Sequence, residues 1–270
     1  MTALRSGLWL PIFDELADPI QVARLAAEAE EAGWHGVFVW DHVRWQVPVK
    51  QVADPWIVLA AIASATESVR IGPMVTPLTR RRPTKVARET ATLDQLSGGR
   101  LTLGVGIGED RFGEEFSKTG EELDPRVRGA MLDESLEILN AAWTGKAVRH
   151  HGEHYVVDGM RFLPTPVQRP GVPIWAAGFP GNMKPLRRAA RCDGFFPVNL
   201  DHPDQVAEVA ETIADLRELT TPFDLAVDVA PGADLSLYEK AGATWWLTQF
   251  SPHGVSLDTV RGVVRDGPAS

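Results

Sequence analysis

The sequence has little cysteine and no long apolar run. Among 270 residues there is one cysteine, Cys192, which excludes an intramolecular disulfide and fits a reducing compartment. Its apolar neighbours favour a small buried filler over a nucleophile. Apolar runs such as residues 172–179 are too short to span a bilayer, and residues 1–10 lack the features of a signal peptide. We therefore expect a soluble, cytoplasmic protein.

Positive charge is also scarce. Lys and Arg total 27 against 36 Asp and Glu, a formal net charge of −9. An acidic chain repels polyanions, so we expect no nucleic-acid partner. The one basic run, residues 80–82, suits a single loop or one anionic group. Hydrophobic residues make up 44% of the chain, which is enough for one large core, and we treat residues 1–270 as a single domain.

Short apolar strands alternate with helices along the chain. The predicted strands cover residues 7–10, 36–40, 69–75, 101–105, 172–177, 193–198, 223–229 and 243–247. Helices begin at capping pairs such as Asp18-Pro19 and Asp54-Pro55, and one runs from Pro203 to about Leu219. Eight repeats predict an α/β fold, a (βα)8 TIM barrel with an insertion after the fourth strand that contains a hairpin within residues 145–170. A doubly wound parallel sheet is the alternative.

Two candidate acid–base residues follow predicted strands. In such a barrel the chemistry gathers at the carboxyl ends of the strands. His42 follows the second strand, and histidine is the side chain that titrates near neutral pH. Glu109 follows the fourth strand, where partial burial would favour its protonated form as a proton donor. The alternatives are a loop histidine bonded to a carbonyl and a solvated glutamate. Asp41 points to the other face and would orient the backbone.

Tryptophan is abundant, with nine in the chain, and several lie at predicted strand ends. The candidate pocket residues are Trp9, Trp40, Trp45 and Trp246. Their rings predict an apolar, flat-walled pocket that suits a planar ring system. The alternative is that Trp175 and Trp246 fill the barrel interior.

Three other patterns point away from common sites. The glycines at 104, 106 and 108 let a ligand approach the backbone, but Glu109 at the sixth position breaks the dinucleotide fingerprint. His150-His151-x-x-His154 lies in the predicted hairpin and favours an exposed loop over a metal site. Arg187, Arg188 and Arg191 suggest a solvated helix face, although the turn at Gly178 can offer backbone amides to a phosphate.

The chain resembles the bacterial luciferase-like monooxygenase superfamily, which includes deazaflavin-dependent oxidoreductases. The resemblance covers most of the sequence, and its motifs are specific because they occur together in this order. The matching stretches are Glu30 to Gly33, Val37 to His42, Val75-Thr76-Pro77 with Arg81-Arg82-Pro83, Leu93 to Arg100 with Leu103 to Gly106, Gly152 to Tyr155, Pro164 to Pro170, Val172 to Gly178 and Ala190 to Gly194.

This resemblance implies a barrel that binds the deazaflavin coenzyme F-420 or reduced FMN at the strand mouths. It implies a non-proline cis peptide near Met74-Val75 that presses on the ring, a phosphate at Gly178-Phe179, and His42 and Glu109 as acid–base groups. Trp45 resembles the aromatic residue that lines the pocket. The candidate cofactor contacts are Asp41, Met74, Val75, Gly106, Ile107, Gly178, Phe179 and Asn199.

Two departures from the family pattern keep FMN open as the cofactor. Phe179 replaces the second glycine of the usual pair after the fifth strand. The stretch between the seventh and eighth strands is short and lacks the basic residues that longer deazaflavin enzymes use for the cofactor's tail.

We expect F-420-dependent hydride transfer to or from a small hydrophobic organic substrate. One alternative is a two-component monooxygenase in which FMNH2 from a separate reductase reacts with O2. Another is a barrel that binds a ligand without catalysis. The family likeness also implies a homodimer.

Overall fold

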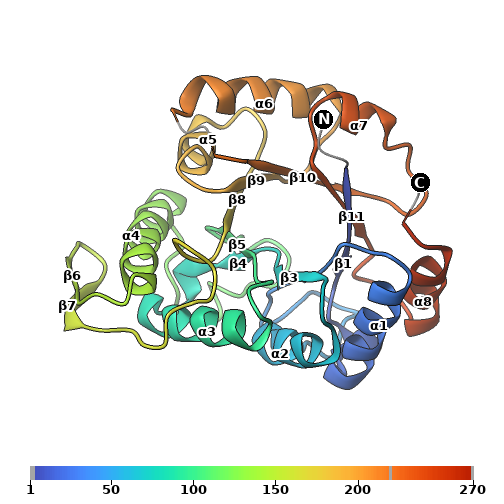
Figure 1. Cartoon of the computed structure of the whole chain (residues 1–270), viewed down its shortest axis with the longest axis horizontal. Coiled ribbons are helices and arrows are strands. Elements are labelled where there is room, and N and C mark those ends of the chain that lie inside the picture. Colours follow the sequence, from blue (N-terminus) through green and yellow to red (C-terminus); the bar gives the residue numbers. More distant parts are fainter. Residues whose placement is uncertain (1–3, 219–220, 269–270) are drawn as a thin grey trace.

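Nine strands of the described residues stand at the centre of the protein, and helices surround them (Figure 1). The structure is a computed structural model that describes residues 4–218 and 221–268. The central strands are β1 (Arg5–Leu10), β2 (Gly36–Val39), β3 (Arg70–Pro73), β4 (Thr76–Pro77), β5 (Leu103–Gly106), β8 (Ile174–Gly178), β9 (Gly194–Pro197), β10 (Asp224–Val229) and β11 (Trp245–Gln249). The pairs formed by these strands are parallel, so their carboxyl ends lie together at one end of the sheet.

The helices begin where the capping residues predict. The carboxylate of Asp18 accepts a hydrogen bond from the backbone N of Ile20 at 2.8 Å, and Asp54 accepts one from Ile57 at 3.0 Å. The predicted end of the sixth helix near Leu219 falls on residues 219–220, which lie outside the described residues. The helices are α1 (Pro19–Glu31), α2 (Pro55–Ala65), α3 (Pro83–Leu96), α4 (Pro125–Trp143), α5 (Met183–Ala189), α6 (Asp204–Leu216), α7 (Ser236–Lys240) and α8 (Leu257–Asp266), with 3-10 turns at Asp14–Ala17 and Leu78–Arg80.

The sheet nearly closes on itself between β3 and β5. Its strand order is β3-β2-β1-β11-β10-β9-β8-β5-β4, and a parallel bridge joins Ile71 to Leu101 across the remaining gap. The backbone N of Thr102 donates to the carbonyl of Ile71 at 2.9 Å. Gly72 makes this approach possible, because a Cβ there would lie 1.9 Å from the carbonyl oxygen of Thr102. The predicted barrel is confirmed. The third predicted strand, residues 69–75, corresponds to β3, and the two-residue strand β4 follows just beyond its predicted end.

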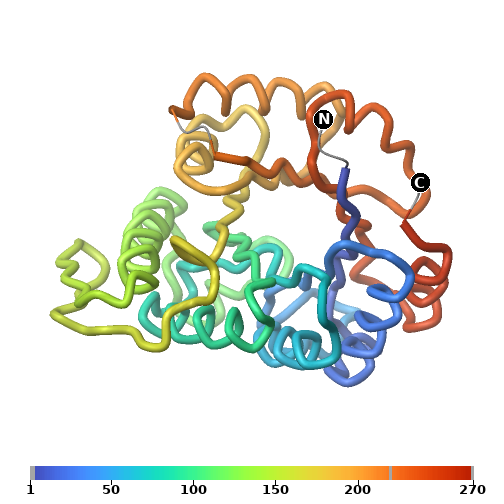
Figure 2. Tube along the Cα trace, in the orientation of Figure 1, coloured from blue at the N-terminus to red at the C-terminus, as the bar shows by residue number. Residues whose placement is uncertain are grey.

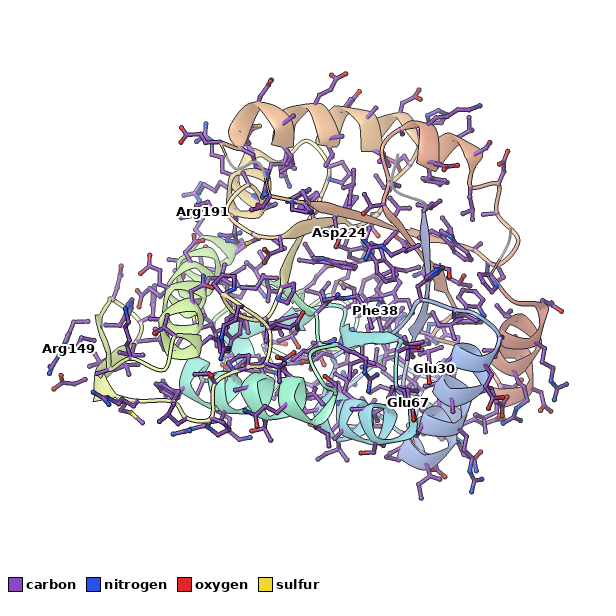
Figure 3. All side chains as sticks on the ribbon, viewed as in Figure 1. Glu30, Phe38, Glu67, Arg149, Arg191 and Asp224 are labelled. Atoms are coloured by element: carbon purple, nitrogen blue, oxygen red, sulfur yellow. The ribbon has the colours of Figure 1, made fainter. Side chains whose placement is uncertain are left out.

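Aromatic side chains fill the amino-terminal half of the barrel. Trp175 and Trp245 are fully buried, and Phe38 packs against both with ring centroids 5.5 Å and 5.9 Å away. Figure 3 labels Phe38 in the middle of the molecule. The alternative interpretation from the sequence, that Trp175 fills the interior, therefore holds for this residue. In the described part of the chain, the large cavity is lined by residues at the carboxyl ends of the strands, beyond this packed half.

The predicted hairpin, β6 (Val148–His151) with β7 (Val156–Met160), lies beside α4 and away from the barrel (Figure 2). His150 Nε2 lies 3.0 Å from Oε2 of Glu134, a residue of α4. The Glu134 carboxylate also accepts hydrogen bonds from the backbone amides of residues 153–155. Across residues 4–218 and 221–268, no group of three or more His, Cys, Asp or Glu side chains is arranged to hold a metal. The histidine pattern therefore anchors the hairpin to α4.

Two further expectations concern Cys192 and the membrane. Cys192 is buried, and burial together with the nearby Asp193 carboxylate raises the pKa of its thiol to about 12. It is a filler, as predicted, because a thiol with such a pKa is not a nucleophile at neutral pH. In the described part of the chain, none of the helices combines the length and apolar composition that crossing a membrane requires.

Candidate active site

The carboxyl ends of the strands open into a cavity of about 1480 Å³. Its lining includes every predicted site residue except Trp246. The predicted residues that line it are Trp9, Trp40, Asp41, His42, Trp45, Met74, Val75, Gly106, Ile107, Glu109, Gly178, Phe179 and Asn199. Segments far apart in the sequence therefore meet at one site, as the barrel predicts.

The structure corrects the placement of Trp246. Trp245 points into the barrel interior, so the next residue along β11 points outward to the helices. The ring of Trp246 packs against Trp34, with centroids 5.2 Å apart. Trp246 therefore lines neither the pocket nor the barrel interior, because its register on the strand is one residue away from the register that the prediction requires.

His42 makes its closest polar contact with a residue that the sequence did not single out. Its Nδ1 lies 2.9 Å from Oε2 of Glu115, which is 2% exposed. The other carboxylate oxygen, Oε1, accepts from the backbone N of Val43 and Arg44 and lies 2.9 Å from Nη1 of Arg80. Burial alone would raise the pKa of Glu115. The hydrogen bond between Glu115 and His42, the charge that His42 carries when protonated, and the charge of Arg80 outweigh burial and lower that pKa.

The neighbouring carboxylate, Asp41, is fully engaged within the protein. It is 1% exposed and pairs with Nη2 of Arg80 at 2.7 Å and with Arg81 at 2.8 Å. The hydroxyl of Thr76 donates to it at 2.6 Å. Asp41 thus borders the cavity, but its side chain holds the ends of β2 and β4 together. This agrees with the orienting role that its place beside His42 suggests.

Aromatic rings form one wall of the cavity around His42. The Trp45 ring lies 4.5 Å from the His42 ring and stacks on Phe112, with centroids 5.1 Å apart and planes at 19°. Phe13 also belongs to this cluster, and its ring centroid lies 5.5 Å from that of Trp45. The indole N–H groups of Trp40 and Trp45 have no hydrogen-bond partner among the described residues. This wall combines flat apolar surface with two free donors.

The peptide bond between Met74 and Val75 is cis, at the position where the family resemblance places such a bond. The indole N–H of Trp9 donates to the carbonyl of Met74, and this contact fixes the Trp9 ring beside the bond. Gly106 faces Val75 from β5, and a Cβ on Gly106 would lie 3.1 Å from Val75 Cγ1. These residues also line the cavity, and the Trp9 ring lies 5.1 Å from that of Trp40.

Glu109 borders the cavity but is exposed, whereas the sequence interpretation has it partly buried. Gly108, with φ at +73°, turns the chain outward just before it. Asp110 then accepts from the backbone N of Phe116 at 2.8 Å, which folds the loop back so that Glu115 faces inward. Glu115 was missed because nothing local separates it from Glu114 and the other acidic residues of this loop.

The far end of the cavity is basic. Arg128 of α4 is 7% exposed, yet its Nε and Nη1 have no hydrogen-bond partner among the described residues. Its guanidinium lies 4.6 Å from the centre of the Phe116 ring. Arg188 is buried and pairs with Asp133 at 2.7 Å, so its predicted place on a solvated face is wrong. The exposed cations along this rim are Arg126, Lys184, Arg187 and Arg191.

The chain is similar to proteins of one family. A model of the luciferase-like monooxygenase family matches residues 8–239. An uncharacterised protein of Mycobacterium tuberculosis is 31% identical over 262 residues, which cover 88% of this chain and 89% of that protein. The F-420-dependent glucose-6-phosphate dehydrogenase of Nakamurella multipartita is 34% identical over 164 residues, which cover 59% of this chain and 47% of the dehydrogenase.

Among solved structures, a monooxygenase from Streptomyces bottropensis superposes with a TM-score of 0.80 at 20% identity, covering 97% of both chains. That likeness supports the barrel. The relatives support a flavin or deazaflavin cofactor. The extent of the family match and its agreement with the barrel show that the chain belongs to the luciferase-like monooxygenase family of oxidoreductases.

Proposed function

We propose that the protein is an F-420-dependent oxidoreductase that transfers a hydride to or from a hydrophobic organic substrate. The observation that carries this proposal is the basic rim of the cavity, formed by Arg126, Lys184, Arg187 and Arg191. F-420 bears anionic groups beyond its phosphate, whereas the side chain of FMN ends at its phosphate. Exposed cations at the cavity in addition to the buried Arg128 therefore favour F-420. The stretch between β10 and β11 is short and lacks the basic residues that longer deazaflavin enzymes use for the tail of the cofactor. The exposed cations of the rim would take over that contact with the tail.

The residues present fit a flavin-like cofactor. The cavity volume of about 1480 Å³ holds a tricyclic ring together with a phosphorylated side chain. Arg128 is a buried cation with two free donor atoms at the basic end, and a guanidinium is well suited to a phosphate. Met74, Val75 and Gly106 would hold the ring, and Gly178 and Phe179 would lie beside the phosphate.

When bound, F-420 would supply or accept the hydride. The protein supplies the surroundings of that transfer. His42 presents a ring nitrogen to the cavity, where it can give or take the proton that accompanies reduction or oxidation of the substrate. Glu109 stands at the rim, where it can pass a proton between the site and solvent. Trp45 and Phe112 bind an apolar substrate and exclude water.

The pocket walls indicate the class of substrate. The stacked Trp45 and Phe112 rings suit a flat or aliphatic body. The indole N–H groups of Trp40 and Trp45, which have no hydrogen-bond partner among the described residues, would suit a carbonyl or hydroxyl oxygen. Asp228 also lines the cavity, and burial raises the pKa of its carboxyl. An alcohol or ketone on a hydrophobic body fits these features.

The second candidate is an FMNH2-dependent monooxygenase that uses O2 and a separate reductase. Arg128 would serve the phosphate of FMN as well as that of F-420, and the similar Streptomyces structure is a monooxygenase. A barrel that binds without catalysis predicts unchanged activity in the His42→Ala and Glu109→Ala variants. A homodimer, a cytoplasmic location and the absence of a nucleic-acid partner stay predictions.

The test is a fluorescence titration of the purified protein with F-420 and with FMN. We expect F-420 to bind with a Kd in the micromolar range, about tenfold or more tighter than FMN. Tighter binding of FMN would overturn the proposal in favour of the monooxygenase. Binding of neither would overturn both.

A further inference from the structure

We propose that Glu115 is a positioning residue that holds the proton of a neutral His42 on Nδ1 and so presents Nε2 to the substrate as an acceptor. This inference rests on the proposed function for its role in catalysis. The arrangement itself depends only on the folded protein. It can therefore be tested with no cofactor bound.

The contacts of Glu115 all lead to the segment that carries His42. Oε2 lies 2.9 Å from His42 Nδ1. Oε1 accepts from the backbone amides of Val43 and Arg44, the two residues that follow His42. A carboxylate that binds both the ring and the adjacent backbone fixes the ring relative to that backbone. This is the role that an orienting carboxylate plays toward a catalytic imidazole in other enzymes.

The rest of the His42 ring is enclosed by groups that do not titrate. The rings of Phe13, Trp40 and Trp45 lie 6.0, 5.9 and 4.5 Å from it, centroid to centroid. Among the described residues no hydrogen bond reaches Nε2. With Nδ1 bonded to Glu115 and the ring faces packed, Nε2 is the nitrogen left to meet a ligand in the cavity.

The guanidinium of Arg80 and the backbone amides of residues 43 and 44 keep Glu115 ionised. Arg80, in the turn after β4, lies 2.9 Å from it, and Arg80 is shared with Asp41 at the end of β2. Within its own loop, Glu114 pairs instead with Arg44 and Lys118 at the surface, and Glu109 stands at the rim. An ionised carboxylate only accepts hydrogen bonds, so the proton in the Glu115–His42 contact belongs to Nδ1.

The experiment is nitrogen NMR of the apoprotein with labelled histidine, at a pH where the ring is neutral. The spectrum of the His42→Gln variant identifies the His42 signals among the seven histidines. In the wild type we expect the Nδ1–H tautomer in about tenfold excess or more, the preference that a charge-assisted hydrogen bond supplies. Finding His42 mainly as the Nε2–H tautomer in the wild type would overturn the proposal without any variant of Glu115.

Two glutamate variants complete the test. In Glu115→Gln we expect the tautomer excess to fall at least severalfold, because a neutral amide does not require a donor at Nδ1. Glu114→Gln is the matched control: it makes the same change one residue away, at a side chain 53% exposed, and should leave the His42 signals unchanged. Unchanged signals in Glu115→Gln would also overturn the proposal.

The cofactor titration distinguishes a failure of the proposed function from a failure of the proposed role of Glu115. Glu115→Gln should bind F-420 within about threefold of the wild type, since Arg128 and the basic rim are intact. If the wild type binds neither F-420 nor FMN, the proposed function fails, while the tautomer measurement still decides the role of Glu115.

Discussion

Two arginines at opposite ends of the barrel show how the protein divides stability from binding. Arg100, at the amino end, donates to the carbonyls of Ala63, Thr66, Val69 and Ser97 and to the hydroxyl of Thr66, at 2.7–3.0 Å. Arg128, at the carboxyl end, is buried with two donor atoms unpaired among the described residues. Arg100 thus satisfies its donors within the protein, whereas Arg128 keeps two donor atoms for a ligand.

Replacing Arg100 should have the largest effect on stability. Arg100→Met leaves several carbonyls at the end of α2 and the start of β3 without a donor. We expect the free energy of unfolding to fall by about 3 kcal/mol. Urea denaturation measures it, and cofactor affinity of the folded protein should not change. The control is Arg149→Met at the exposed hairpin (Figure 3), whose side chain is 73% exposed and which should lose almost nothing. Equal losses in both variants would contradict the comparison.

Arg128→Met should show the reverse pattern. It removes the free donors at the basic end of the cavity, so the Kd for the preferred cofactor should rise about 10–100-fold. No protein acceptor loses its hydrogen bond, and the free energy of unfolding should change by less than about 1 kcal/mol. Fluorescence titration and urea denaturation give the two quantities. A large loss of stability with unchanged cofactor affinity would show that Arg128, like Arg100, stabilises the fold and does not bind the cofactor.

The Glu30 carboxylate, which like Arg100 is satisfied within the protein, makes part of the stability depend on pH. Although burial opposes it, hydrogen bonds from the backbone amides of Glu67, Ser68 and Val69 and from the Ser68 hydroxyl lower the pKa of Glu30 to about 2 (Figure 3 labels Glu30 and Glu67). Because the pKa is lowered in the folded protein, the Glu30 carboxylate stabilises the fold fully when the pH is above the ordinary pKa of 4.5. That contribution is lost as the pH falls toward 2.

We therefore expect Glu30→Gln to lower the free energy of unfolding at neutral pH by about 1 kcal/mol. The difference from the wild type should shrink as the pH falls below about 4. Urea denaturation over a pH series measures it. A difference that is constant with pH would show that the carboxylate charge is not what stabilises this loop.

The smallest effects belong to the exposed rim. Lys184→Gln and Arg187→Gln should each weaken F-420 binding by about two- to threefold, because exposed charges interact through water. FMN binding should not change, and added salt should remove the difference. If FMN binding weakens equally, the rim does not distinguish the two cofactors.

The fold was predictable because its signals are local. Caps such as Asp18 and Asp54 and short apolar strands act within a few residues, and the barrel followed from their repetition. Trp246 was misplaced because strand faces alternate, so a choice between two adjacent tryptophans needs the register. Periodicity alone does not give that register.

The site was predictable only in part. His42 lies three residues after the end of β2, so its place at the mouth follows from the barrel. Glu109 and Glu115 lie in the same acidic loop, and the choice between them depends on the contact of Glu115 with His42, 73 residues away in sequence. Such pairings depend on how the loop folds over the barrel, which a single sequence does not encode in any short pattern.

The shared partner of Asp41 and Glu115 has an electrostatic consequence. Arg80 bridges the two buried carboxylates, and Arg81 pairs with Asp41, so two guanidinium groups and two carboxylates cancel. The frame around His42 is therefore electrically neutral. When the imidazole gains a proton, the whole cluster becomes a monocation in a poorly solvated place. A negative charge that develops on a substrate oxygen would then meet an unopposed positive one.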